Sequence, residues 1–411
     1  MELIERIKNL LQKPICDNCL GRVFAQMLSG MSNKERGRII RDFAAFLIEA
    51  QELENFAQEN FNEYNFRLTK KTSSKKKLNC YFCGNIFEKL EKIAEKAIKK
   101  LEKIEFNTFL VGNRPSKEML EKEEEMWKLA GMDYCEPLKA ELNRELGKLI
   151  SQKMKKTAEL KKPEVVILFD WEKGKPKIEI QISSLFIFGY YQKLVRGIPQ
   201  CKWGTPGKYK TSVEQIIAKP LLKATKGKDT KFHGMGREDI DARCLAWRAF
   251  VIEIIEPKKR KINLKEIAKQ INASKKVKVK GLKLVEREMV RKVKEASPDK
   301  TYRVVVKFEK PVKKEELKKL RKLIGVINQQ TPERVLHRRA DKLRKREVKA
   351  IKWKYINSKT VELIIKCSAG LYVKELVSGD NGRTRPSVAE ILGVPAKVVE
   401  LDVIKIEKVK W

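Results

Sequence analysis

The chain has 411 residues, 42% of them hydrophobic, which is enough to build packed cores and excludes global disorder. Lysine and arginine total 92 against 54 acidic residues, a formal net charge of +38 that repels itself in a compact fold and favours a polyanionic partner. No stretch approaches the roughly 18 apolar residues of a membrane-spanning helix. The N-terminus carries acidic residues in place of the uncharged apolar segment of a signal peptide. We therefore expect a cytoplasmic protein that binds nucleic acid, since heat adaptation alone would enrich both signs of charge.

The N-terminal region is expected to be helical. Apolar residues recur at helical spacing over residues 3–11, which predicts a first helix. Ser32 and Glu35 form a capping-box pattern that opens a second helix reaching roughly Leu53. A long apolar stripe predicts a further helix over 86–104.

The eight cysteines indicate a metal site. Four of them form two C-x-x-C pairs, and the others are scattered singly, as in a reducing cytosol. A two-residue spacer lets both thiolates reach one ion, and two pairs complete a tetrahedral zinc site made of Cys16, Cys19, Cys80 and Cys83. Because a closed four-cysteine site has no open position, this Zn²⁺ is expected to hold the N-terminal helices together without taking part in chemistry. Redox motifs and disulfides are the alternatives.

The middle of the chain mixes strands and helices. A short strand over 106–111 is expected to end at Gly112, and a helix is expected over 137–154. The continuous apolar run at 163–170 is typical of a buried strand, whereas residues 177–183 alternate as a half-buried strand does.

Beyond residue 192 the pattern changes, so we predict one domain over 1–192 and another over 193–411. Amphipathic strands there alternate with helices near 263–272 and 313–323. The predicted strands cover residues 250–255, 276–284, 302–308, 353–356 and 361–365. This mixture indicates an α/β or an α+β fold, and we predict α+β, with a largely antiparallel sheet and flanking helices in the second domain.

Several cofactor sites are excluded. The two histidines, His233 and His337, have no second metal-type residue at ligand spacing, so a catalytic metal centre is not expected. No G-x-G-x-x-G follows a strand, and the run GTPGKYKTS (204–212) has the wrong spacing for a phosphate loop. The exclusion is weaker for adenosylmethionine, whose binding folds have a less uniform glycine pattern.

Three segments of the C-terminal half carry the residue types of an active site. They are HGMGREDIDAR (233–243), KTYRVVVKF (300–308) and CSAGLYVKELVSGDNGRT (367–384). In the first, glycines allow a tight turn and Arg237 can engage a phosphate or a carboxylate. The third places Lys374 after a strand, in the turn entering a helix. Taken singly, each has a plainer interpretation: a charged turn, a packed strand-edge tyrosine and a solvated lysine.

In this order, the three segments resemble the active-site motifs of pseudouridine synthases, and most closely those of the archaeal enzymes that modify uridines 54 and 55 of tRNA. The paired cysteines, FNTFLVG (106–112) and KIEIQISSLFIFGYYQKLVRGIPQCKW (177–203) resemble the zinc-bearing THUMP region of that family. TPERVLHRRAD (331–341) is also similar to a family stretch, so the resemblance covers nearly the whole chain.

The resemblance implies a role for each matching residue. Asp239 is similar to the catalytic aspartate, and Asp241, two residues away, is its main rival. Asp239 is preferred because the aspartate of related families follows an Arg-x pair, as in Arg237-Glu238-Asp239. Tyr302 matches the tyrosine that stacks on uracil, and Lys374 the basic residue that pairs with the aspartate. The implied substrate-binding set is Tyr302, Lys374, Leu376, Arg237 and Tyr372.

The implied reaction isomerises uridine to pseudouridine in the TΨC loop of tRNA. It changes no oxidation state and needs no organic cofactor, and the aspartate acts either as a nucleophile at the anomeric carbon or as a base at the 2′ carbon. The expected partner is the TΨC arm of tRNA, with no membrane and no obligatory protein partner. The alternatives are another THUMP-containing tRNA enzyme, a methyltransferase or a thiouridine synthase, and a non-catalytic RNA-binding protein.

Overall fold

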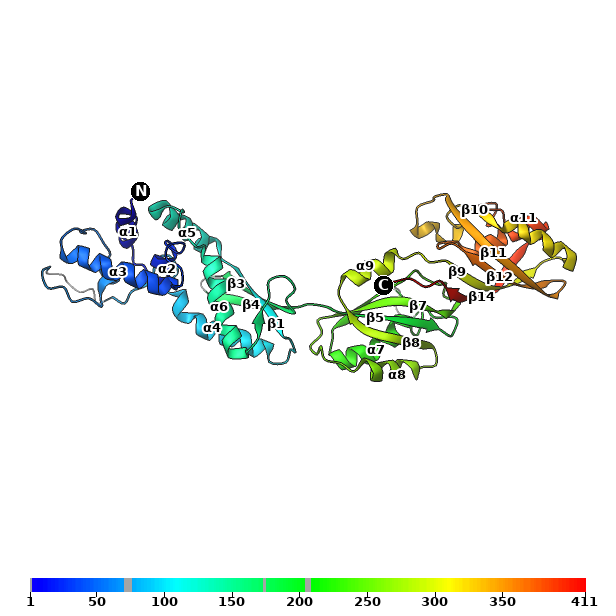
Figure 1. The fold of residues 1–411 in the computed structure, drawn as a ribbon, viewed down its shortest axis with the longest axis horizontal. Coiled ribbons are helices and arrows are strands. Elements are labelled where there is room, and N and C mark those ends of the chain that lie inside the picture. Colours follow the sequence, from blue (N-terminus) through cyan, green and yellow to red (C-terminus); the bar gives the residue numbers. More distant parts are fainter. Residues whose placement is uncertain (1, 70–75, 173–174, 204–207) are drawn as a thin grey trace. The chain divides into compact units, whose positions relative to one another are not determined.

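The computed structural model describes residues 2–69, 76–172, 175–203 and 208–411, and residues 204–207 of the predicted glycine-containing run lie outside this description (Figure 1). The chain forms two compact units, Met1–Ser183 and Ser184–Trp411. The division falls before strand β5 (Leu185–Lys193), earlier than the predicted boundary at 192, because β5 pairs with two strands of the second unit. The segment 177–203 is therefore shared between the units.

The helices of the first unit follow the local sequence signals. Ser32 and Glu35 form the predicted capping box: the Glu35 amide donates to Ser32 Oγ at 3.2 Å, and the Ser32 amide donates to the Glu35 carboxylate at 2.8 Å. The capped helix ends at Glu49, short of Leu53. The predicted helix over 86–104 begins as a 3₁₀ turn and ends at Leu101. The helical segments are α1 (Leu3–Leu11), α2 (Asp17–Arg22), α3 (Asn33–Glu49), η1 (Gln58–Phe61), η2 (Ile86–Lys89), α4 (Leu90–Leu101), α5 (Lys117–Ala130) and α6 (Leu138–Met154).

A four-stranded sheet completes the first unit, in the order β2-β1-β3-β4. Its strands are β1 (Thr108–Arg114), β2 (Thr157–Ala158), β3 (Val165–Glu172) and β4 (Lys175–Ile182). Strand β1 continues through Gly112, beyond its predicted end, because Gly112, Asn113 and Arg114 pair with residues of β3. Strand β3 alternates buried and half-buried residues, so its apolar run packs fully on one face, against a core shared with α4 and α6.

The second unit is built on a ten-stranded sheet with the order β13-β10-β11-β12-β9-β14-β7-β5-β8, in which β6 also pairs with β7. Within the described residues of this sheet, the pairing of β7 with β14 is the only parallel one, so the predicted, largely antiparallel α+β architecture is confirmed. Besides β5, the strands are β6 (Asp229–Gly234), β7 (Arg243–Ile255), β8 (Val277–Val285), β9 (Lys300–Phe308), β10 (Gly325–Gln329), β11 (Arg344–Asn357), β12 (Thr360–Cys367), β13 (Thr384–Arg385) and β14 (Ala396–Ile406).

Helices give each half of this sheet its own core. Helices α7 (Val213–Thr225) and α8 (Leu264–Asn272) pack on β5, β7 and β8 (Figure 1). The other half packs on η3 (Lys314–Leu323), α10 (Val373–Ser378) and α11 (Val388–Leu392), while α9 (Glu288–Glu295) and η4 (Glu333–Arg338) complete the set. The segment predicted as a helix over 313–323 is thus a 3₁₀ helix. None of the helices within the described ranges has the length and apolar character needed to cross a membrane.

A buried carboxylate joins the two halves of the large sheet. Asp402 on β14 is fully buried between β7 and β9. It accepts hydrogen bonds from Arg196 at 2.6 Å, from Arg243 at 2.7 and 2.9 Å, and from Arg303 at 3.2 Å. Burial alone would raise the pKa of Asp402, but the hydrogen bond from Arg243 and the charge of Arg196 lower it below its ordinary value. Arg196 also donates to the carbonyl of Asp241 at 2.9 Å, which ties the junction to the loop before β7.

We predict that Asp402→Asn destabilises the second unit by about 3–5 kcal/mol, because three guanidinium groups lose their buried counter-charge. A carboxylate with a lowered pKa contributes stability above its unfolded pKa of about 3.9, and this contribution is lost as the pH falls through the lower folded value. The loss of stability in acid should therefore be smaller in the variant. Urea unfolding at pH 7 and at pH 3 measures both effects.

The matched control is Glu400→Gln. Glu400 contacts Arg303 at 3.0 Å and Arg196 at 3.5 Å, but its side chain is 47% exposed. Solvent screens such a pair, so its loss should cost less than about 1 kcal/mol. Equal effects of the two substitutions would contradict the role assigned to Asp402.

Candidate active site

The loop between β6 and β7, residues 235–242, carries the predicted acidic residues, and a buried glutamate anchors it. Gly236 has a φ of +73°, a conformation that lets the chain turn directly after β6. Glu238 then points inward, where it accepts a hydrogen bond from the Tyr191 hydroxyl at 2.9 Å and pairs with Arg248 at 3.2 Å. All three side chains are buried, so the anchor is rigid.

The backbone of the same loop is held by β5. The buried Lys193 ammonium donates to the carbonyls of Asp239 and Ile240, at 3.0 and 3.1 Å, and to that of Ile198 at 3.0 Å. Gln200 donates to the carbonyl of Gly236 at 2.9 Å. These bonds fix the main chain of the loop, so the Asp239 carboxylate occupies a defined position in the second unit.

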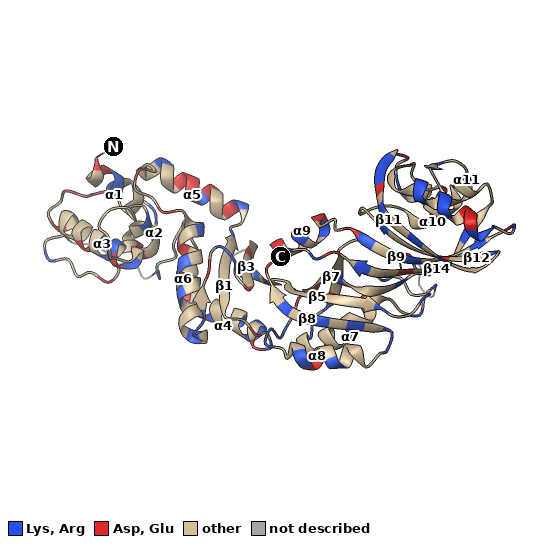
Figure 2. Cartoon of the chain, turned by 45° about the vertical axis from the view of Figure 1, so that its right-hand side comes forward, with Lys and Arg blue, Asp and Glu red and all other residues tan. Residues whose placement is uncertain are grey.

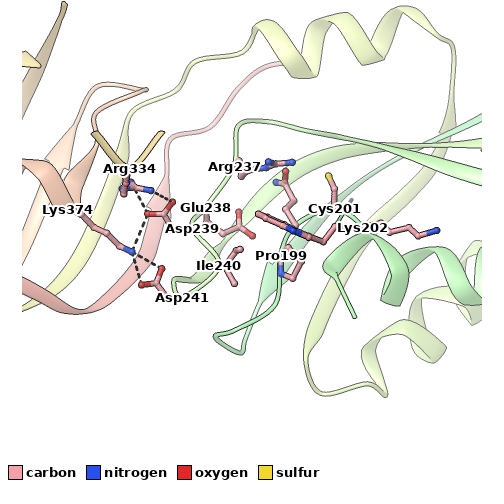
Figure 3. Close-up of a pocket in the computed structure, with 12 residues that line it drawn as sticks. Pro199, Cys201, Lys202, Arg237, Glu238, Asp239, Ile240, Asp241, Arg334 and Lys374 are labelled. Atoms are coloured by element: carbon pink, nitrogen blue, oxygen red, sulfur yellow. Dashed lines mark hydrogen bonds and ion pairs between the residues drawn. The ribbon is translucent and has the colours of Figure 1, made fainter. Parts of the chain in front are cut away.

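Two cations meet that carboxylate (Figure 3). Both terminal nitrogens of Arg334 donate to the carboxylate oxygens of Asp239 at 3.3 Å, and Lys374 Nζ lies 3.5 Å from it. Lys374 contacts Asp241 more closely, at 2.7 and 2.8 Å. Asp241 is the more exposed acid, with 68% of its side chain accessible against 32% for Asp239. Lys374 thus lies between the two rival aspartates.

Arg334 is a site residue that the sequence reasoning missed. It comes from η4, inside the stretch 331–341 whose resemblance to a family segment was the available signal. The buried carboxylate of Glu375, next to Lys374 on α10, accepts from Arg334 Nε at 2.6 Å. Glu375 thereby fixes one side of the guanidinium, also accepting from Nη2 at 3.4 Å, while Nη1 and Nη2 donate to Asp239 (Figure 3).

Asp239 lies at a cavity of about 320 Å³ together with three of the predicted substrate-binding residues, Arg237, Tyr302 and Tyr372. Tyr302 is on β9, and burial raises the pKa of its hydroxyl, so that group is neutral at pH 7. Tyr372 precedes α10, and its hydroxyl accepts from Arg339 at 2.7 Å. A planar ring of nucleobase size would fit this space beside an ionised carboxylate.

The remaining predicted residues lie in two other places. Lys374 lines an adjoining cavity of about 450 Å³, which Asp239, Arg237 and Trp203 also line. Leu376 is fully buried in the core beneath α10 and lines neither cavity. Its contribution is to the packing of the helix that presents Lys374 and Glu375.

The four cysteines of the two C-x-x-C pairs come together in the first unit. Their sulfur atoms all lie within 4.8 Å of one another, and Cys16 Sγ is 3.6 Å from Cys83 Sγ. Tetrahedral zinc with bonds of about 2.3 Å places its sulfur ligands about 3.8 Å apart. The cluster therefore fits a closed metal site, with Cys16 preceding α2 and Cys83 preceding η2.

Comparison with known families matches both units. Residues 93–170 match the family described as "Pus10 THUMP domain, archaeal", and residues 186–407 match "Pus10, C-terminal". The first match covers three of the four strands of the sheet in the first unit, except the end of β3, and the second covers nearly all of the second unit.

Similar proteins share the full length of the chain. The "tRNA pseudouridine synthase Pus10" of Methanothrix thermoacetophila is 41% identical over 96% of this chain and 92% of its own length. The protein of the same name from Pyrococcus furiosus is 39% identical over 98% of both chains. Among solved structures, a Cbf5-Nop10-Gar1 complex matches with a TM-score of 0.32 and 16% identity, over 52% of this chain and 47% of the other. That structural likeness is too weak to support an argument.

We predict that Lys374→Gln raises the pKa of Asp241. Burial by itself would raise this pKa, but the hydrogen bond and charge of Lys374 lower it below its ordinary value, so removing the cation should return it toward about 3.9. A carboxyl-carbon NMR titration measures the change. Lys366→Gln, which removes a cation paired with Glu407 at 3.2 Å, is the matched control and should leave the pKa of Asp241 unchanged.

Proposed function

The chain belongs to the Pus10 family of tRNA pseudouridine synthases, which are isomerases, and on this premise we propose that it converts uridines 54 and 55 in the TΨC loop of tRNA, with Asp239 as the catalytic carboxylate. The observation that carries the proposal is the position of Asp239. Its main chain is fixed by Lys193, its carboxylate contacts Arg334 and Lys374, and it shares a cavity with Tyr302.

The chemistry requires an ionised carboxylate beside the ribose. The reaction breaks the bond between uracil N1 and the anomeric carbon, turns the ring and joins it again through C5, with no redox change. The C5 proton is then removed and N1 takes up a proton, so the product is an isomer of the substrate. Asp239 acts either as the nucleophile at the anomeric carbon or as the base at the 2′ position. Arg334 and Lys374 supply the counter-charge of this carboxylate when the substrate displaces water.

The cavity residues hold the uracil while it turns. Tyr302 offers an aromatic face, and stacking of a base on such a ring contributes about 1–3 kcal/mol. Arg237 and Tyr372 line the same cavity and are proposed to contact the target nucleotide. Leu376 is proposed to act indirectly, because its packing in the core holds α10, which carries Lys374. Because the target lies in a folded loop, it must be flipped out to reach Asp239.

The proposed partner is tRNA, with no obligatory protein partner, in the cytoplasm. The net charge of +38 is suited to a phosphate backbone. Exposed lysines lie along strands such as β8, which carries Lys278, Lys280 and Lys283 (Figure 2). We assign the isomerisation to the second unit, which holds Asp239, and RNA binding to the first, which carries the THUMP match.

We further propose that the cysteine cluster binds one structural Zn²⁺. Four thiolates satisfy the ion completely, so it has no open position for a substrate. The ligands join the start of α2 to the turn before η2, across a long loop, and the buried sulfurs of Cys19 and Cys80 lie in the main core of the helical region. The ion thus links two segments of that core.

We predict that Asp239→Asn abolishes pseudouridine formation, a loss of at least about 10⁴-fold in rate, while the affinity for tRNA changes by less than about threefold. One carboxylate performs the chemistry, whereas many phosphate contacts determine binding. Single-turnover assays with unmodified tRNA, with filter binding in parallel, measure both quantities. Asp241→Asn is the matched control, because Asp241 shares Lys374 with Asp239. Its rate should fall by about tenfold or less, and the opposite ranking would move the catalytic role to Asp241.

Cys80→Ser should reduce bound zinc from about one ion per chain to near zero and lower the melting temperature of the first unit, because the metal contributes folding free energy. Metal analysis and calorimetry check this prediction. Cys135→Ser is the control, since Cys135 lies in the same unit but outside the cluster. Full zinc content in Cys80→Ser would overturn the assignment.

A further inference from the structure

The strand that carries Tyr302 begins with a buried lysine that has no counter-charge. The side chain of Lys300 is only 8% exposed. No ion pair or side-chain hydrogen bond joins its ammonium to any residue in the described part of the chain. The stem of the side chain is buried and the ammonium group opens only into the cavity that Lys300 lines, so it is largely withdrawn from water without a counter-charge, which lowers stability.

The groups around Lys300 do not provide a negative charge to balance that of its ammonium. Lys300 Nζ lies 3.5 Å from the point that a Cβ at Gly236 would occupy, and Arg248 Nη1 lies 3.4 Å from the same point, so two cations converge there. The nearby acid, Glu238, already pairs with Arg248. Two thiols complete these surroundings, and burial raises the pKa of Cys244 on β7 and that of Cys367 on β12, the latter to about 12. Both thiols are therefore neutral at pH 7.

Lys300 belongs to the wall of the cavity that holds Asp239 and Tyr302. It lies two residues before Tyr302 on β9, and residues at this spacing point to the same face of a strand. The cavity therefore contains a fixed carboxylate, an aromatic ring and a cation without an anion. An anion that forms in this cavity during the reaction would supply the counter-charge that Lys300 lacks.

The proposed reaction produces such an anion. When the bond between N1 and the anomeric carbon breaks, its electron pair leaves with the uracil and spreads over N1 and the two carbonyl oxygens. This holds whether Asp239 forms a bond to the anomeric carbon or takes the 2′ proton. In both cases the ring carries a negative charge until it joins the ribose again through C5.

We propose that Lys300 Nζ donates a hydrogen bond to a carbonyl oxygen of the target uracil and stabilises the negative charge of the detached ring. This inference rests on the proposed function. The proton stays on Nζ throughout, so the lysine acts as a fixed cation. Donors already positioned for a charge that develops in the transition state contribute about 10²–10³ in rate.

The test is Lys300→Met, which keeps the length of the side chain and removes the charge. The single-turnover rate on unmodified full-length tRNA should fall about 100-fold, and the affinity for tRNA should change by less than about threefold. The melting temperature should stay the same or rise, because a buried unpaired cation is replaced by an apolar side chain. Lys307→Met is the matched control: Lys307 lies on the same strand but is exposed, so the variant loses the same charge without loss of rate.

Lys300→Arg supplies a second measurement. Burial and the charge of Arg248 lower the pKa of Lys300 to about 8, so the charged form is lost as the pH rises through that value. The rate of the native enzyme should therefore fall above about pH 8. In Lys300→Arg this alkaline fall should move to higher pH, because a guanidinium stays protonated.

Each other outcome contradicts the inference. An unchanged rate in Lys300→Met would show that the cation does not act on the ring. A loss of affinity as large as the loss of rate would show that it holds a phosphate group. A fall in melting temperature that accounts for the lost rate would show a structural role. The proposed function fails separately: it is wrong if the native enzyme forms no pseudouridine or if Asp239→Asn keeps full activity.

Discussion

The pairing of β14 with both β7 and β9 is the constraint on which the active site depends. Strand β14 joins two half-sheets that have separate cores, and the buried Asp402 binds arginines from three segments at this junction. Asp239 comes from the loop before β7, Tyr302 from β9 and Lys374 from the helix after β12. These three residues can share one site only because β14 holds the half-sheets side by side. The parallel pairing of β7 with β14 is part of that arrangement.

The site is organised by an imbalance of charge. Its acidic groups are each held by basic ones: Glu238 by Arg248, Asp239 by Arg334 and Lys374, and Asp241 by Lys374. Lys300 is a buried lysine for which this set of ion pairs provides no acidic partner. An unpaired charge withdrawn from water lowers stability. Lys300, beside Tyr302, would therefore serve the proposed reaction at a cost in stability. The exposed lysines elsewhere differ from Lys300, because water solvates them and their charge costs little stability. Together they give the surface a positive potential, which would attract a polyanion.

The first unit uses other means to hold its fold. Its helical region places two segments distant in sequence at one cysteine cluster, while the sheet below it packs on α4 and α6 as an ordinary amphipathic core. Each unit therefore contains a polar element that ties distant segments together, a cysteine cluster in the first and an aspartate–arginine network in the second. The proposed four-cysteine metal site and the Asp402 carboxylate share a property: in each, the ligand or hydrogen-bonding positions are taken by the protein, so both are suited to a structural role.

Local sequence patterns predicted the features that depend on nearby residues. The capping box at Ser32, the helix over 3–11, the two C-x-x-C pairs and the alternation along β4 and β9 are local patterns, and each appears in the structure. Motif order also brought Asp239, Tyr302 and Lys374 together as candidates. The partner that each side chain contacts depends on how the strands pair and pack. The tertiary structure placed Arg334 on Asp239, set Lys374 closer to Asp241, moved β5 into the second unit and buried Lys300 without a counter-charge. These outcomes depend on strands paired across long stretches of chain, and the spacing of neighbouring residues carries no information about such contacts.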